Sequence, residues 1–321
     1  MARHTRIPRR GARRLLAVVA IGAGIAFATG PPPISQPAMS ASAGRATIVV
    51  RVVAAENFYA DIVKSIGGSH VSVLGIIINP NTDPHSYESS TTDARAVADA
   101  GLVVQNGLGY DSFMPKLENA SPDAKRTVVD VGAALGYKTG ANPHLWYDPA
   151  TMPRVAALVA ADLSRRDPAD KSVFAANLRR FDASLAPWRS LIVSLRRRYK
   201  GAPVAVTEPV FGYAAAAIGL DIRTPRPFAL AVQEGNDPSP RDVRTVQNLL
   251  AEKRVKVLLY NQQAVEPLTS TLLGLARAHH VPIVGVYETM PASKTYQSWM
   301  GAEATALDKA LTHGVSTERI S

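Results

Sequence analysis

The sequence contains no cysteine, few aromatic residues and, beyond its first thirty residues, no long apolar run. None of the 321 residues is cysteine, and only 6% are Phe, Trp or Tyr. The missing cysteine excludes disulfides, thiolate metal ligands and a lipid attached through a thioether. The low aromatic content argues against a cleft lined for haem or another small organic ligand. A chain of this length can bury a sufficient core without covalent cross-links.

The N-terminal segment lacks acidic residues and has the features of an export signal. Residues 1–14 contain six arginines and no Asp or Glu, and residues 15–28 are apolar. Small-residue motifs follow at Ala26-Phe27-Ala28 and Ala41-Ser42-Ala43. A basic head, a short apolar stretch and an A-x-A site are typical of a secretory signal peptide. We predict a signal peptide over residues 1–43, because the apolar stretch is shorter than the ~20 residues of a membrane span.

Most of the net positive charge belongs to that segment. The whole chain carries 36 basic and 26 acidic residues, whereas residues 44–321 carry 30 and 26, a net charge of +4. This balance is ordinary for a soluble protein and removes the case for a nucleic-acid partner. We expect a soluble, monomeric periplasmic protein that binds neither nucleic acid nor a small organic ligand.

From residue 44 the sequence alternates short apolar strands with helices, and it does so twice. The first half predicts strands at 48–54, 71–78, 102–105 and 127–131, and helices at 58–66 and 91–100. The second half predicts strands at 204–207, 255–260 and 283–286, and helices at 211–218, 241–252, 267–279 and 295–312. Short buried runs that alternate with helices indicate mainly parallel sheets.

A long helical pattern separates the two halves. Apolar residues recur on one face from Val173 to Leu195, and Pro187 should kink or interrupt the run. We therefore predict an α/β protein of two lobes, each with a mainly parallel sheet flanked by helices, joined by one long linking helix. The expected divisions are an N-terminal lobe at 44–168, a linking helix at 169–200 and a C-terminal lobe at 201–321.

Two histidines and two glutamates stand close to the ends of predicted elements. His85 follows a Pro- and Asn-rich loop after a strand, His144 precedes a helix, and Glu208 and Glu288 follow strands of the second half. Ligands of α/β folds gather at the carboxyl ends of strands. Imidazole suits Zn²⁺ and its neighbours, while carboxylates add affinity for the harder Mn²⁺. The residues alone leave other roles open, such as solvated loop acids or a helix cap made by Glu208.

Five segments carry a family resemblance over essentially the whole chain after residue 51. They are Asp83-Pro84-His85-Ser86-Tyr87-Glu88, Asn106-Gly107-Leu108-Gly109-Tyr110, Asn142-Pro143-His144-Leu145-Trp146-Tyr147-Asp148-Pro149, Thr207-Glu208-Pro209-Val210-Phe211-Gly212-Tyr213 and Tyr287-Glu288-Thr289. By these segments the chain resembles the zinc/manganese class (cluster A-I) of ABC-transporter solute-binding proteins. The resemblance implies that His85, His144, Glu208 and Glu288 bind Zn²⁺ or Mn²⁺ as cargo between the lobes. It also implies an ABC permease as partner and no catalytic site.

Two departures from the family pattern leave the cargo metal open. Zinc-type members commonly have His at the third ligand position, where this chain has Glu208. They often carry a His-rich loop between the first two ligands, whereas residues 86–143 contain no histidine. Glu288 in place of Asp is instead similar to some zinc-type members. In almost any such site Zn²⁺ would bind more tightly than Mn²⁺.

Two other functions are weighed against transport. A zinc hydrolase usually keeps three protein ligands and an open water position, and the chain lacks an H-E-x-x-H motif. A surface adhesin on the same scaffold stays possible from sequence, although no cysteine is available for a lipid anchor. Among the remaining polar residues, we expect His70 to lie in a turn and Arg196-Arg197-Arg198 to form a solvated helix face.

Overall fold

The computed structural model describes residues 48–79, 82, 87–264 and 266–320, which contain two four-stranded parallel sheets. The strands are β1 (Val50–Glu56), β2 (Val71–Ile77), β3 (Leu102–Gln105), β4 (Thr127–Asp130), β5 (Pro203–Val206), β6 (Asp221–Ile222), β7 (Leu258–Asn261) and β8 (Ile283–Val286). Their orders are β2-β1-β3-β4 and β6-β5-β7-β8, so the second sheet repeats the topology of the first. In both sheets the strand order reverses beside the first strand, where α/β folds bind their ligands.

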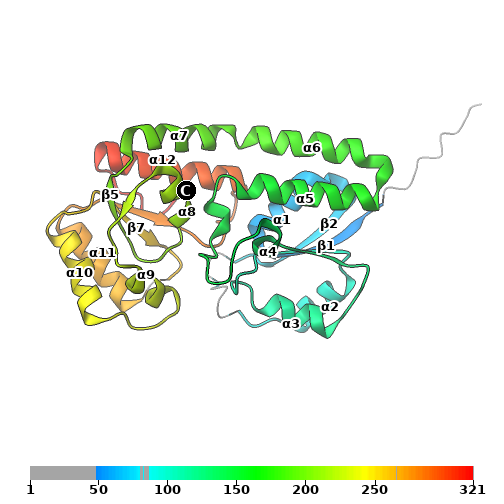
Figure 1. The fold of residues 1–321 in the computed structure, drawn as a ribbon, viewed down its shortest axis with the longest axis horizontal. Coiled ribbons are helices and arrows are strands. Elements are labelled where there is room, and N and C mark those ends of the chain that lie inside the picture. Colours follow the sequence, from blue (N-terminus) through cyan, green and yellow to red (C-terminus); the bar gives the residue numbers. More distant parts are fainter. Residues whose placement is uncertain (1–47, 80–81, 83–86, 265, 321) are drawn as a thin grey trace, which may run out of the picture. The chain divides into compact units, whose positions relative to one another are not determined.

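Helices flank both sheets (Figure 1). The first lobe contains α1 (Asn57–Gly67), α2 (Thr91–Asp99), α3 (Phe113–Ala120), α4 (Val131–Leu135) and α5 (Thr151–Arg166). The second lobe contains α8 (Gly212–Ile218), α9 (Arg226–Gln233), α10 (Pro240–Ala251), α11 (Pro267–Ala278) and α12 (Tyr296–His313). Short 3₁₀ turns are η1 (Gly68–His70), η3 (Leu145–Tyr147) and η4 (Pro168–Asp170). This arrangement confirms the predicted fold class.

Local sequence explains where these elements begin and end. All four residues of β3 are buried, because a parallel strand covered on both faces presents no polar side. Ser90 and Asp93 form a reciprocal capping box at the start of α2, and Thr295 and Ser298 form another at the start of α12. Gly314 ends α12 in a left-handed conformation with φ 68°, which an L side chain rarely adopts.

The predicted linking helix consists of two successive helices, α6 (Lys171–Ser184) and α7 (Ala186–Tyr199), which run along both lobes (Figure 1). They meet at Leu185, two residues before Pro187, which has no N–H to donate to the preceding turn. The N–H of Leu185 donates to the carbonyl of Asp182 at 3.3 Å, so the chain tightens there without changing direction. α6 packs against α1 and α5, whereas α7 packs against α8 and α12.

One of the three hydrophobic clusters of the described residues joins the two lobes beneath these helices. Phe58 of α1 packs against Trp146, with ring centroids 4.6 Å apart, and against Trp299 of α12 at 5.9 Å. Tyr147 packs against Phe211 of the second lobe at 5.3 Å. These rings belong to one cluster of buried residues with members from both sheets. Because this shared cluster is apolar and buried, large relative movements of the lobes are disfavoured.

Among the described helices, none has the length and apolar content needed to cross a membrane.

Candidate metal centre

The first predicted ligand, His85, lies outside the described residues, as does the predicted signal peptide. Tyr87, two residues after His85, is held by a hydrogen bond and a ring contact. Its hydroxyl donates to Asp93 Oδ2 at 2.9 Å, and its ring packs edge-on against Phe113 with centroids 4.8 Å apart. Desolvation and then Asp93 raise the pKa of Tyr87 to about 12, so it remains a neutral donor. Tyr87 is therefore held against the first lobe by α2 and α3.

His144 is fully buried at the start of η3, in the first lobe. Its ring packs edge-on between Trp146, with centroids 5.3 Å apart, and Tyr110, at 5.9 Å. The two aromatic rings hold the imidazole plane in one orientation. Its Nε2 atom lies 3.5 Å from Glu288 Oε2 of the second lobe and makes no hydrogen bond with any described residue.

Asn142 determines which nitrogen of His144 carries the proton. The Asn142 side-chain nitrogen donates to the carbonyl of Pro209 at 2.8 Å, which fixes the orientation of the amide. Its Oδ1 must then accept, from the backbone N–H of His144 at 3.1 Å and from His144 Nδ1 at 2.6 Å. Nδ1 therefore acts as a donor, which leaves Nε2, on the side of Glu288, as the nitrogen that can bind a metal ion. This is the arrangement that a metal-binding imidazole needs.

The same asparagine requires a glycine in the opposite lobe. A Cβ atom on Gly212 would lie 2.8 Å from the Asn142 side-chain nitrogen, a distance that real Cβ contacts do not show. Gly212 belongs to the segment that begins with Glu208, so the two ligand-bearing segments fit each other closely. Tyr213 adds a hydrogen bond from its hydroxyl to the carbonyl of Asn142 at 2.9 Å.

The two glutamates follow β5 and β8 of the second sheet, the strands on either side of β7, and both are buried. Glu208 follows β5, Glu288 follows β8, and Asn261 ends β7 between them. The side-chain nitrogen of Asn261 donates to Glu208 Oε2 at 3.0 Å and to Glu288 Oε1 at 2.6 Å. Asn261 thus holds two carboxylates of like charge close together. The N-cap of α8 is Phe211 and not Glu208, whose carboxylate instead accepts from Asn261.

Tyr110 connects Glu288 with the first lobe. Its hydroxyl donates to Glu288 Oε2 at 3.1 Å, and burial, followed by Glu288, raises the pKa of Tyr110 well above its usual value. The preceding turn is held by Asp111, whose carboxylate accepts from the backbone N–H of Gly107 at 2.9 Å. Gly107 has φ 74°, and a Cβ atom there would collide with Asp130 at 2.2 Å. Gly107 therefore allows the turn that presents Tyr110.

The structure brings together three of the four predicted ligands. The imidazole comes from one lobe and both carboxylates come from the other, around Tyr110 and Asn261. A cavity of about 700 Å³ lies beside them, lined by the neighbours of these ligands, among them Asn142, Pro143 and Pro209. One imidazole nitrogen and two carboxylates with buried, oriented donor atoms can bind a first-row divalent cation.

Replacing Asn142 with Ala is expected to weaken Zn²⁺ binding by about 10- to 100-fold, because the orientation of His144 and its tautomer are both lost. Asn142→Asp keeps the acceptor for Nδ1 but loses the donor to Pro209, so it should retain more affinity than Asn142→Ala. Competitive titration of the metal-stripped variants measures both. Asn236→Ala, at an exposed position of the second lobe, is the matched control. Equal affinities for Asn142→Ala and wild type would contradict the role assigned to this side chain.

Comparison with known proteins identifies the family. The family model described as "ZnuA: Zinc-uptake complex component A periplasmic" matches residues 52–310. The chain belongs to this family. One similar protein is named for manganese and not for zinc. It is the manganese ABC transporter substrate-binding lipoprotein PsaA of Streptococcus pneumoniae serotype 4. It is 25% identical over 227 residues, which cover 65% of this chain and 71% of that protein.

Solved structures similar to this member of the zinc-uptake component A family have the same fold. The Mn-bound periplasmic metal binding protein from Candidatus Liberibacter asiaticus has a TM-score of 0.66 at 18% identity, covering 82% of this chain and 99% of that one. A mutant structure of the laminin-binding adhesin Lmb from Streptococcus agalactiae has a TM-score of 0.68 at 22% identity, covering 82% and 100%.

Proposed function

We propose that this chain captures Zn²⁺ or Mn²⁺ between its lobes through His85, His144, Glu208 and Glu288, and delivers the ion to the permease of an ABC transporter. Its family is that of the metal-binding component of such transporters. The cargo is therefore a divalent metal, and the permease is the partner that a binding component serves.

One observation supports this ligand assignment more than the others. His144 Nε2 and Glu288 Oε2 come from different lobes and lie 3.5 Å apart, with Nδ1 already engaged by Asn142. Two donors bound at about 2.0–2.1 Å to one tetrahedral ion stand roughly 3.4 Å apart. The pair is thus spaced for a shared metal ion. Because binding would connect the lobes, the ion has the differential contacts needed to stabilise one state of the protein.

The remaining parts of the proposal concern the form of the protein. We place the signal peptide at 1–43 and expect the exported chain to be a soluble monomer in the periplasm, whereas its relative PsaA is named a lipoprotein. The lobes are assigned to 44–168 and 201–321, with the linking helix at 169–200. We assign no enzymatic activity, because four protein ligands leave no open position for a metal-bound water.

The test combines metal analysis with metal supply in cells. Protein purified from the native periplasm should contain Zn or Mn, and the stripped protein should bind Zn²⁺ more tightly than Mn²⁺ in competitive titration. A strain lacking the protein should grow poorly in chelator-treated medium, and the wild-type gene but not His144→Ala should restore growth. Absence of any high-affinity metal class, or full rescue by His144→Ala, would overturn the proposal.

A further inference from the structure

His70, Asp167 and Asp170 form a second cluster of metal-binding side chains. Among the described residues, this is the one group of His, Asp or Glu in which three ligand atoms all lie within 4.8 Å of one another. His70 Nδ1 is 3.5 Å from Asp167 Oδ2 and 3.7 Å from Asp170 Oδ2. The sequence predicts only a turn residue at His70, because nothing in its spacing connects it with residues about a hundred positions later.

The distances suit a shared ion better than a direct contact. Both are too long for a good hydrogen bond, and His70 Nδ1 is buried without a hydrogen-bond partner among the described residues. They are close to the roughly 3.4 Å that separates two donors on one tetrahedral Zn²⁺. The pair His144–Glu288, in a family that binds metals, shows the same 3.5 Å spacing.

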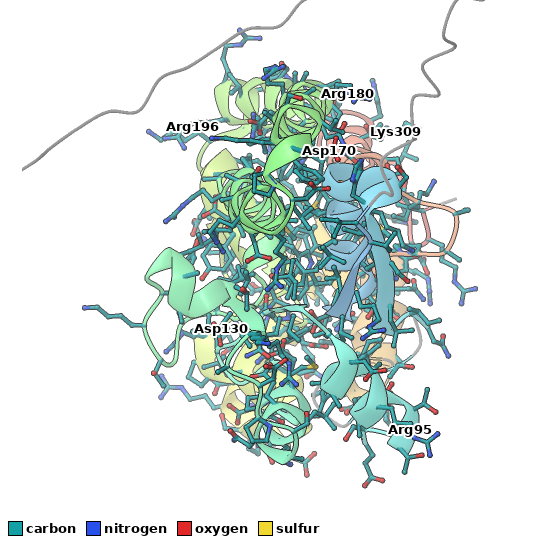
Figure 2. The ribbon with its side chains drawn as sticks, turned by 90° about the vertical axis from the view of Figure 1, so that its right-hand side faces the viewer. Arg95, Asp130, Asp170, Arg180, Arg196 and Lys309 are labelled. Carbon is teal, nitrogen blue, oxygen red and sulfur yellow. The ribbon has the colours of Figure 1, made fainter. Side chains whose placement is uncertain are left out.

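The backbone holds the three side chains in place. His70 ends η1, directly before β2, and its ring packs edge-on against Phe174 with centroids 5.3 Å apart. Asp167 and Asp170 belong to the turn between α5 and α6, where the N–H of Asp170 donates to the carbonyl of Asp167 at 3.2 Å. Figure 2 shows Asp170 beside the blue elements at the start of the first lobe. His70 follows α1 in this part of the chain, and its Nδ1 lies 3.7 Å from Asp170 Oδ2. The three donors are therefore positioned by elements that are already packed together.

The three side chains differ in exposure, and the most exposed one leaves a path by which an ion can enter. The side chain of Asp167 is 1% exposed, that of His70 12% and that of Asp170 31%. Asp170 thus forms the open side, where water can complete the coordination.

We infer that His70, Asp167 and Asp170 bind a second divalent cation of the Zn²⁺ type, apart from the cargo. His70 directly precedes β2 of the first sheet, whereas Glu208 and Glu288 follow strands of the second sheet, so the two sites are built from different elements. An ion at His70 connects η1 with the turn that opens α6. It fastens the first of the linking helices to the first lobe and binds more weakly than the cargo, because only three protein ligands hold it.

Zn²⁺ titration of the metal-stripped full chain tests this site without reference to transport. Wild type should bind two equivalents, one tight and one at least about 10-fold weaker. His70→Ala and, as a milder change, Asp170→Asn should each remove the weaker equivalent and keep the tight one. His144→Ala should do the reverse. His313→Ala, exposed at the end of α12, should keep both.

Thermal unfolding provides a readout that does not depend on counting ions. Zn²⁺ should raise the Tm of His144→Ala, and this increase should disappear in His144→Ala/His70→Ala. One equivalent in wild type, or a weaker equivalent that survives both His70→Ala and Asp170→Asn, would overturn the second site. If wild type lacked only the tightly bound Zn²⁺ equivalent, the proposed cargo site would be contradicted. The site at His70 would not be affected by that result.

Discussion

His144→Ala should weaken tight Zn²⁺ binding by at least about 100-fold, a larger loss than the 10- to 100-fold expected for a residue that only orients a ligand. His144 supplies the one described imidazole at the centre, and its ring is held by Tyr110, Trp146 and Asn142. Alanine removes the donor atom, and Tyr110, which also contacts Glu288 from the first lobe, offers only a neutral hydroxyl. Competition against a chelator of known affinity measures the loss.

Controls separate loss of the ligand from loss of the fold. His313→Ala removes an exposed histidine and should leave affinity unchanged. His144→Ala also creates a cavity among the surrounding rings, so its unfolding curve without metal must be compared with that of wild type. A variant that unfolds normally but still binds Zn²⁺ within about 10-fold of wild type would refute the assignment of His144.

Glu303 should have the largest effect on stability. It is 1% exposed on α12, where it accepts hydrogen bonds from Trp299 Nε1 at 2.6 Å and lies 2.7 Å from the hydroxyl of Tyr147. Tyr147 has only one proton and also lies 2.7 Å from the carbonyl of Tyr287. If Glu303 is protonated, it can donate to Tyr147, which then donates to Tyr287. Burial raises the pKa of Glu303 to about 8, which agrees with this arrangement.

Glu303→Ala would leave the buried groups of Trp299 and Tyr147 without their partner, at a cost of about 3 kcal/mol or more in unfolding free energy. Glu303→Gln reproduces the protonated acid, since its oxygen accepts from Trp299 and its amide donates to Tyr147. We expect it to cost less than about 1 kcal/mol at neutral pH. Urea unfolding of both variants measures the difference. Equal losses for Ala and Gln would contradict the hydrogen-bond scheme.

The raised pKa of Glu303 also fixes the direction of a pH effect. Between its ordinary value of 4.5 and about 8, the folded protein holds a proton that the unfolded chain has released. The stability from this group is complete at low pH and falls as pH rises, with a slope of at most about 1.4 kcal/mol per pH unit. The stability of wild type relative to Glu303→Gln should therefore decrease from about pH 5 to 8. A flat difference would show that Glu303 is ionised throughout.

The sequence predicts elements well where packing imposes a simple pattern. The strand at 102–105 is confirmed at β3 with the same bounds, because a central parallel strand must be apolar throughout. The break near Pro187 follows from the chemistry of proline. Periodicity is weak evidence over eight or fewer residues, so α4 and α9 are missed, whereas α8, with seven residues, is found where the helix at 211–218 is predicted.

The supporting residues of the site could not be found in the same way. Asn261 bridges Glu208 and Glu288, which are 53 and 27 positions away, and Asn142 reaches Pro209 over 67 positions. Such partners depend on how the two lobes meet, and this information is absent from local patterns. Glu303 looks like a surface acid on an amphipathic helix until Tyr147 and Trp299 are seen around it. The predicted ligand set itself stays a prediction until metal is located.

Crystallography of the Zn-loaded protein at the zinc absorption edge locates the metal most directly. We expect the strongest anomalous peak to lie within about 2.0–2.2 Å of His144 Nε2 and of oxygens from Glu208 and Glu288, with His85 completing the site. If the strongest peak lay elsewhere and neither His144 nor Glu288 contacted a metal ion, metal capture between the lobes would be contradicted.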